Sequence, residues 1–216
     1  MYKERNMWVF RVNRGYGGGK PSGSCPIDFD CTRVENEIEQ SNNSPIDYTN
    51  CIEFLMNDLF SNGILRQGWG VPGLDLILPE SQWSENYVIA SHRYWSEETD
   101  CSHATGRRNI LLHMLNMRTG DIIFLPNVGE RCIDEGKCTV VTVKAPCQFE
   151  DRENKLLPDF GHTILIEKKR VFDYNEAQLY RGLFGAPFMH AIDPIGQHYQ
   201  SYSTFVDFVS FFYDTL

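Results

Sequence analysis

The chain has 216 residues, of which 42% are hydrophobic and 13% aromatic, and its formal net charge is -9. This length suits one large domain or two small ones, and the aromatic content argues against a disordered chain. Non-specific binding of nucleic acid depends on Lys and Arg side chains that meet phosphates. The acidic balance therefore argues against strong binding of that kind.

The sequence carries no sign of a membrane protein or a secreted protein. No apolar run approaches the length that spans a bilayer, and the N-terminal stretch MYKERNMWVFRVNRG combines charges with an apparent strand instead of a signal peptide. We therefore expect a soluble, cytoplasmic protein that does not bind membranes.

Seven cysteines are an odd number, which favours free thiols in a reducing compartment. Three of them, with His103, could supply four zinc ligands, as Cys101-x-His103 and Cys132-x5-Cys138. Neither spacing is a standard zinc pattern. We therefore predict neither a metal nor a cofactor.

The first half of the chain predicts two strands, one helix and a long insertion. Apolar and polar residues alternate over 7–13, residues 14–47 are rich in Gly, Ser, Asn and Pro, and apolar residues recur at helical spacing over 49–62. A short strand, 64–68, follows, and then the stretch GWGVPGLDL. In it, Trp69 stands between Gly68 and Gly70, and a turn presents Asp75.

The second half mixes helices and strands without a regular βαβ repeat. Helices are predicted at 81–95, 109–117, 175–183 and 204–213, with a polar link at 97–103. Strands are predicted at 121–126, 138–144, 162–167 and 170–174. This mixture predicts an α+β fold, a curved sheet or small barrel flanked by helices.

Sequence support for catalysis is thin. Pro158-Asp159 followed by Glu167-Lys168-Lys169 can be written as a magnesium-dependent nuclease signature of the PD-(D/E)xK kind, but the short gap leaves little room for the usual hairpin. The run GYGGGKPS lacks the first glycine of a phosphate-binding loop and has Pro21 after Lys20. No cysteine or histidine lies in a nucleophile pattern.

A binding site is the better-supported hypothesis, because aromatic and short polar residues fall where the predicted strands end. These residues are Asn13, Trp69, Phe149, Phe160 and His162. Aromatic walls with a polar group that contacts a base edge are typical of sites for flipped or single-stranded bases. A methylated base adds apolar surface that such walls can bury.

The order of these segments resembles the EVE and YTH-like branch of the PUA-like superfamily over roughly residues 7 to 175. The segments are WVFRVN, ILRQGWGVPGLDL, NILLHMLNM, RTGDIIFLPN, CTVVTVKAPCQFED and DFGHTILIE. The likeness is to the versions that serve as specificity modules in bacterial modification-dependent restriction systems of the Mcr type. The chain differs from them in its 14–47 insertion and in its acidic charge. It also has GLDL, with a leucine after the glycine, where an acidic residue usually follows the glycine directly in that group.

The resemblance implies a PUA-like twisted β-barrel, in one domain of residues 1–216, that reads a modified base and is not an enzyme. It implies that Trp69 forms one wall of an aromatic cage and that Phe149 or Phe160 forms the second. Asn13 would be the short polar residue that the family has at the end of its first strand. Gly70 would let the planar base approach the indole. It also implies a motor or nuclease partner, either a separate subunit or the rest of a larger protein with this chain as its N-terminal domain.

We therefore predict a reader that flips a modified, methylated base of DNA into a cage and serves a restriction or phage-defence system. Contacts to the nucleic-acid backbone are assigned to Arg11, Arg14, Lys20, Arg66, Arg107 and Arg108. The alternatives left open are the magnesium-dependent nuclease, an RNA-binding module and a protein-interaction module on the same fold.

Overall fold

A computed structural model describes most of the chain apart from its N-terminal loop region. The described residues are 5–12, 51–95, 99–130, 133–153, 155, 157–175, 181–184, 188 and 190–213. The 14–47 insertion, and with it Asn13, Arg14, Lys20 and Cys132, lies outside them.

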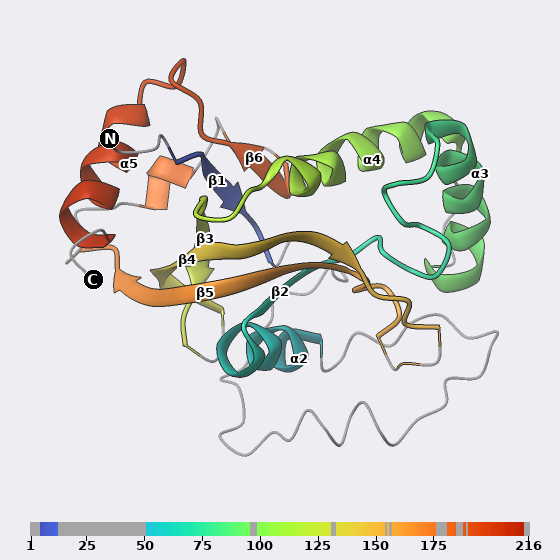
Figure 1. Cartoon of the computed structure of the whole chain (residues 1–216), viewed down its shortest axis with the longest axis horizontal. Coiled ribbons are helices and arrows are strands. Elements are labelled where there is room, and N and C mark those ends of the chain that lie inside the picture. The colour runs from blue at the N-terminus through green and yellow to red at the C-terminus, as the bar shows by residue number, and fades with distance from the viewer. Residues whose placement is uncertain are drawn as a thin grey trace.

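Six strands form a curled, mixed sheet that resembles half of a barrel (Figure 1). They are β1 (Met7–Phe10), β2 (Ile64–Gln67), β3 (Ile122–Val128), β4 (Ile133–Phe149), β5 (His162–Asp173) and β6 (Ile192–Pro194). Their order across the sheet is β2-β5-β4-β3-β1-β6. Only the β1–β3 pair is parallel among these described strands.

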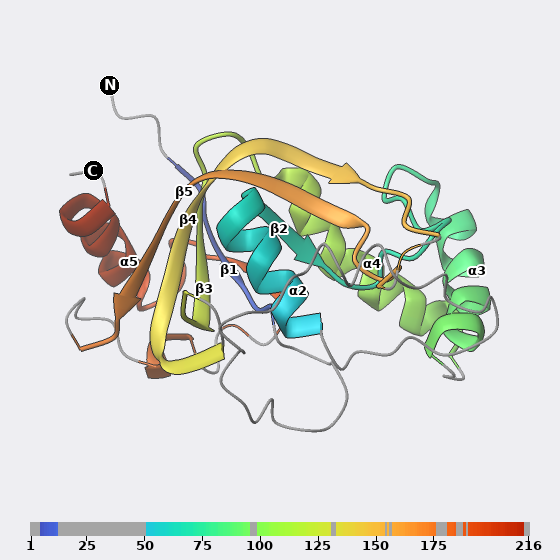
Figure 2. The ribbon, with the colours of Figure 1, turned by 90° about the horizontal axis from the view of Figure 1, so that it is seen from below.

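Four α-helices flank the sheet within the described part of the chain: α2 (Cys51–Asn57), α3 (Glu80–Ala90), α4 (Cys101–Asn116) and α5 (Tyr202–Phe208). Single π-helical turns extend α2, α3 and α5, to Asn62, Trp95 and Tyr213. Figures 1 and 2 agree that α3 lies at one end of the molecule and α5 at the other. The long helix α4 runs from α3 back to the sheet.

Both faces of the sheet are buried, which explains the unbroken apolar run of β3. Trp8 and its register partner Ile123 belong to the core shared with α2, α3 and α4. The next pair, Val9 and Phe124, belongs to the core under α5. A strand that is covered on both faces needs apolar residues at every position instead of alternate ones.

The mixed sheet and its flanking helices confirm the α+β class that the sequence predicted.

Most predicted elements are present, and the largest difference is at the start of α4. The predicted polar link at 97–103 is wrong in its last residues, since α4 begins at Cys101. Asp100 caps this helix, because its carboxylate accepts the backbone N–H of His103 at 2.8 Å. Of the predicted helix at 175–183, the structure describes a short 3-10 turn at Arg181–Phe184, while 176–180 lie outside the described residues.

The strands of the central hairpin are longer than predicted. The strand β4 continues to Phe149, and β5 runs without interruption through Lys168 and Lys169. Separately, no helix among the described residues is long and apolar enough to cross a membrane.

Candidate functional site

Trp69 follows Gly68, which is the first residue after β2. Its backbone has a left-handed conformation with a φ of 62°. Such a conformation costs a bulky residue on the order of 1–3 kcal/mol unless the surroundings enforce it. Here Asp159 enforces it twice. Its carboxylate accepts the N–H of Trp69 at 2.6 Å, and its backbone carbonyl accepts the N–H of Gly70 at 2.8 Å.

Gly70 and Gly161 let two chain segments pass in direct backbone contact. A Cβ on Gly161 would overlap the carbonyl oxygen of Gly70 and lie 2.7 Å from that of Glu150. A Cβ on Gly70 would lie 2.8 Å from the backbone nitrogen of His162. The side of Gly70 on which a side chain would stand is therefore filled by His162. This glycine allows the two segments to pack closely.

The segment before β5 is held by Arg66, whose side chain is 5% exposed. Its guanidinium bonds to the carboxylate of Asp58, to that of Glu150 at 2.7 Å and to the carbonyl oxygen of Phe160 at 3.0 Å. Arg66 therefore binds three groups of the protein itself. It does not face the open surface on which a phosphate contact was predicted.

A second buried arginine completes this network. Arg152 is 1% exposed and donates to Glu150 at 3.1 Å. The two guanidinium groups, of Arg66 and Arg152, lie over the ring of Phe54 at 5.4 and 5.0 Å. Burial raises the pKa of Glu150, but the two arginines outweigh that effect and hold this pKa below its ordinary value.

The predicted aromatic residues separate into one core residue and one residue near the surface. Phe160 is fully buried, 6.1 Å from the ring of Phe54. Phe149 is half-buried at the end of β4, and its ring lies 5.2 Å from that of His162. Of the two candidates for a second wall, Phe149 is therefore the one that a ligand can reach.

His162 is 1% exposed, and its Nε2 has no hydrogen-bond partner among the described residues. Burial lowers the pKa of His162 to about 4, although a hydrogen bond with the backbone of Trp69 acts in the opposite direction. The imidazole is therefore neutral at neutral pH, and it supports Trp69 from inside the fold.

Asp75 is half-buried in the turn after Trp69, where its carboxylate accepts the N–H of Ile77 at 3.1 Å. Burial, with a smaller contribution from Asp75, raises the pKa of Cys147 to about 12. Cys147 lies two residues before Phe149 on β4. The structure therefore brings Trp69 and Phe149 to His162, while Asp75 lies in the turn six residues after Trp69.

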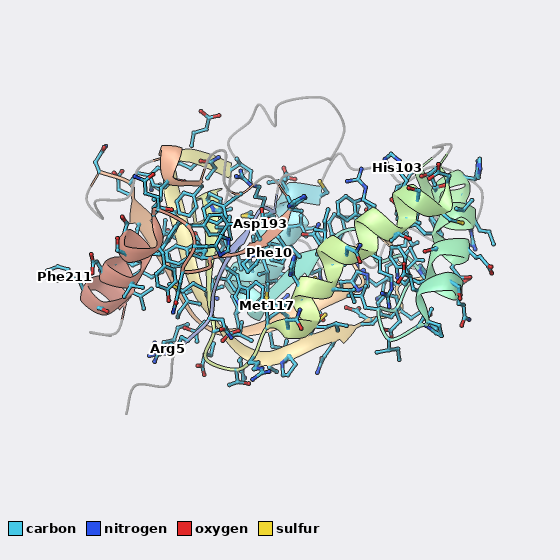
Figure 3. All side chains as sticks on the ribbon, turned by 90° about the horizontal axis from the view of Figure 1, so that it is seen from above. Arg5, Phe10, His103, Met117, Asp193 and Phe211 are labelled. Atoms are coloured by element: carbon cyan, nitrogen blue, oxygen red, sulfur yellow. The ribbon has the colours of Figure 1, made fainter. Side chains whose placement is uncertain are left out.

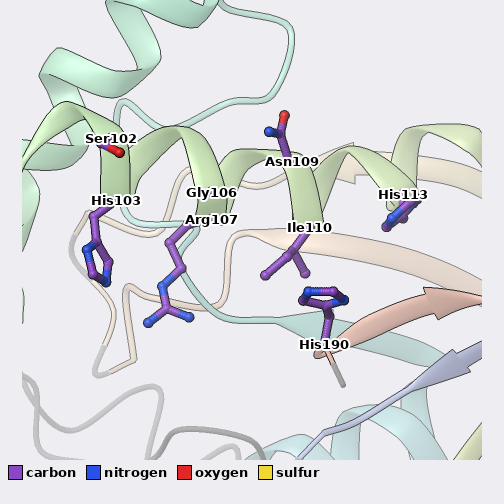
Figure 4. A pocket seen from close by; sticks show the side chains of 8 residues that line it. All are labelled: Ser102, His103, Gly106, Arg107, Asn109, Ile110, His113 and His190. Carbon is purple, nitrogen blue, oxygen red and sulfur yellow. The ribbon is translucent and has the colours of Figure 1, made fainter. Parts of the chain in front are cut away.

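A cavity of about 590 Å³ lies along α4 beside this region (Figure 4). Its lining residues are Ser102, His103, Gly106, Arg107, Asn109, Ile110, His113 and His190. The side chains of His103, Arg107 and Ile110 project from the same side of the helix, as their spacing of four and three residues dictates. The guanidinium of Arg107 stacks on Trp69, with Cζ 4.5 Å from the ring centroid.

The described lining of the cavity carries one permanent cation, Arg107, and no carboxylate, although the chain as a whole is acidic. It contains one arginine and three histidines, and no Asp or Glu is among its residues. Asp193 lies behind His190, whose backbone N–H and Nδ1 it contacts at 2.8 and 2.9 Å. Burial lowers the pKa of His113, an effect that Asp193 partly offsets and His190 reinforces. The lining is therefore suited to an anionic ligand.

Arg107 differs from the other predicted cations that the structure describes. Arg11 donates to the carbonyl oxygens of Phe184 and, at 2.8 Å, Phe188. Arg108 donates to the carbonyl oxygens of Leu76 and Leu78 at 3.3 and 3.0 Å, and Arg66 is buried. Arg107 forms no hydrogen bond or ion pair within the described part of the chain, and of these four it alone lines the cavity.

The residues of the nuclease signature do not form a metal site in this arrangement. Asp159 is 2% exposed and holds the backbone of Trp69, whereas Glu167 is exposed in the middle of β5. Among the described residues, no three His, Cys, Asp or Glu side chains are grouped as metal ligands would be.

The sequence reasoning missed the histidine-lined cavity. Its predicted helix began at Asn109, so His103 and Arg107 were not recognised as members of one helical face with Ile110. The available signal was Asp100 three residues before His103, since Asp is a preferred N-cap residue. His190 reaches the cavity from the segment before β6, and no local pattern indicates this.

Two glycine-to-alanine substitutions should change stability in opposite directions. Gly161→Ala places a methyl group against two backbone oxygens, so we expect a loss of about 2 kcal/mol or more in the free energy of unfolding. Gly106→Ala meets nothing within 4 Å on α4, so we expect a gain of up to about 1 kcal/mol from helix propensity. Urea unfolding measures both, and a Gly161→Ala variant as stable as the wild-type chain would contradict the packing of Gly161 against Gly70.

Acid should destabilise the fold through His162. Its pKa is near 6.5 when unfolded and about 4 when folded, so the unfolded chain binds more protons between these values. The stability is fully present above pH 6.5 and falls by up to roughly 3 kcal/mol as the pH drops towards 4. Urea unfolding at pH 7 and pH 5 should show a smaller loss for His162→Gln than for wild type. His92→Gln, at an exposed histidine, controls for the loss of an imidazole. If His162→Gln lost as much stability between pH 7 and pH 5 as the wild-type chain, the assignment to His162 would be contradicted.

Comparisons of the chain with protein-family models, with curated proteins and with solved structures find no match.

Proposed function

We propose that this chain is a non-catalytic reader of nucleic acid that takes a flipped, methylated base of DNA against Trp69. The observation that carries the proposal is the stack of Arg107 on Trp69 at the edge of an open cavity of about 590 Å³. That volume lies within the range of about 300–1,000 Å³ that is usual for small-molecule sites.

The groups around Trp69 supply the chemistry that base recognition requires. An indole offers a flat apolar surface, and stacking of one base on an aromatic side chain contributes about 1–3 kcal/mol. Phe149, half-buried beside His162, is the proposed second wall, and the carboxylate of Asp75 is proposed to accept a hydrogen bond from an exocyclic amine. A methyl group on the base would add apolar area that these rings can cover.

The backbone around Trp69 favours a binding function because it is rigid. Two backbone hydrogen bonds that Asp159 accepts, and the close contact of Gly70 with Gly161, hold the backbone that carries the indole. A pre-organised aromatic ring loses little conformational freedom when a ligand stacks on it, which increases affinity. The left-handed conformation of Trp69 is thus consistent with strain retained at a functional position.

The curled, mixed sheet with its flanking helices supports the finer proposal of a PUA-like barrel of the EVE and YTH-like kind. On that proposal, the chain is the specificity module of a restriction or defence system and works with a motor or nuclease. Asn13, the polar residue assigned to the end of the first strand, would belong to the same site. It lies outside the described residues.

Base contacts, more than phosphate contacts, would have to provide the affinity. The chain has a net charge of -9, and Arg11, Arg66 and Arg108 bind carbonyl or carboxylate groups of the protein itself. Only Arg107 of the described candidates lines the cavity. Neutralising few phosphates gives weak non-specific binding, which suits a protein that must distinguish a modified base from a large excess of unmodified DNA.

The proposal predicts a difference in affinity between matched duplexes. Fluorescence anisotropy would compare otherwise identical probes that carry an unmodified base, N6-methyladenine, 5-methylcytosine or 5-hydroxymethylcytosine. We expect one modified probe to bind best. Trp69→Ala should weaken its binding by about 5- to 150-fold, the equivalent of 1–3 kcal/mol, because the stacking surface is lost.

The matched control is Phe211→Ala, which removes an aromatic side chain that is 72% exposed. Phe211 lies at the opposite end of the molecule from His103 and the cavity (Figure 3). Equal affinity for all duplexes, or undiminished binding by a folded Trp69→Ala variant, would contradict the proposal. Preference for RNA over all duplexes, or cleavage of the probe in the presence of Mg²⁺, would do so as well.

A further inference from the structure

Arg107 lies between the cavity and Trp69. Arg107 is among the residues that line the cavity, whereas Trp69 is not. The guanidinium lies over the indole with Cζ 4.5 Å from the ring centroid, and the rest of Trp69 packs against the buried core. A planar ligand that enters through the cavity therefore meets the guanidinium before it meets the indole. Arg107 must move before such a ligand can stack on Trp69.

Within the described part of the chain, no acidic group holds Arg107 in place. It forms no ion pair or hydrogen bond there, and no carboxylate lines the cavity. Its stack on Trp69 is a cation–π contact, an interaction that is weak at sites open to water. The guanidinium can consequently leave the indole at little cost if a ligand supplies a stronger partner.

A phosphate is the partner that fits this guanidinium best. Arginine binds phosphate through two parallel, charge-assisted hydrogen bonds, which are stronger than a cation–π contact near water. His103 lies four residues before Arg107 on the same side of α4, and His190 faces this side from the segment before β6 (Figure 4). His103, and His190 through the ring nitrogen that does not contact Asp193, are further donors to an anion, so the cavity can accept the negative charge to which Arg107 turns.

We propose that Arg107 couples the two parts of a nucleotide: the base replaces its guanidinium on Trp69, and the guanidinium then binds a phosphate next to that base. This inference rests on the proposed function and adds to it a specificity-determining residue. A neutral ligand would remove Arg107 from the indole without giving it a new partner. The site would therefore discriminate against bases that lack an adjacent phosphate charge.

A double-mutant cycle between the protein and the DNA tests this coupling. The probe is the duplex that binds best, prepared with one neutral methylphosphonate linkage on the 5′ or the 3′ side of the modified base. For the wild-type chain, we expect one of these two linkages to weaken binding by about tenfold or more, the loss typical of a hydrogen bond to a charged group. For Arg107→Ala, the same linkage should change affinity less than about twofold.

In Arg107→Ala, affinity should depend less on the charge of the phosphate next to the base. The preference for the modified base should remain, because Trp69 is still present. Folding is not at risk, since Arg107 is half-buried and has no hydrogen bond in the described structure. Arg107→Gln serves as a second variant that keeps a polar side chain of similar length. The control is Arg118→Ala, which removes an exposed arginine just beyond the end of α4, about 15 Å further along the chain's helical path.

The outcomes separate this inference from the proposed function. If Trp69→Ala abolishes base preference but neutral linkages weaken wild type and Arg107→Ala equally, the coupling through Arg107 is contradicted and the reader function stands. If neither neutral linkage affects the wild-type chain, the coupling is contradicted too. If no duplex shows base preference, both proposals fail. A linkage effect present in wild type and in Arg118→Ala, and absent from both Arg107 variants, supports the coupling.

Discussion

The buried guanidinium of Arg66 joins three parts of the chain on which the site depends. Through Asp58 it holds the turn after α2, through Glu150 the end of β4, and through the carbonyl oxygen of Phe160 the segment before β5. Removing Asp58, which is nearly as buried as Arg66, would leave an uncompensated buried charge, which typically costs about 3–5 kcal/mol. The pair with Glu150 contributes less, because that carboxylate is 42% exposed to solvent. Asp159, the residue before Phe160, fixes Trp69 in its left-handed conformation. The position of the indole is therefore determined by charges that lie inside the fold.

The outer side of the site has the opposite character, because it is open and its cation forms no hydrogen bond or ion pair among the described residues. Arg107 stacks on Trp69 and lines a cavity without carboxylates, in a chain whose net charge is -9. In an acidic protein, a cavity that presents an arginine and no carboxylate is a local site at which an anionic ligand can be attracted. On the proposed function, the indole and the guanidinium would divide the work of recognition: the indole would contact a base, and the guanidinium would contact the charge beside it.

Periodicity and turn residues in the sequence predicted much of the fold, because those signals are local. Apolar spacing located α2, α3 and β3, and the glycines placed Trp69 at the end of β2. The first turns of α4 were missed because CSHATGRR has few apolar residues, and the helix there depends on the cap by Asp100. Phe160 was assigned to a cage although it lies in the core, since an aromatic residue after a turn has the same local pattern in both settings. The bond of Asp159 to Trp69 spans 90 positions and is invisible to any local pattern.

The most direct test of the account follows the four tryptophan indoles by NMR during titration with the modified duplex. The Nε1 of Trp8 donates to Asp121 at 3.0 Å and that of Trp83 to the carbonyl oxygen of Leu74 at 2.8 Å, so both indoles are fixed in the core. The signal of Trp69, assigned with a Trp69→Phe variant, should shift on binding while those of Trp8 and Trp83 stay in place. Saturating binding of the duplex with an unmoved Trp69 signal would contradict the claim that Trp69 and Arg107 form the binding site.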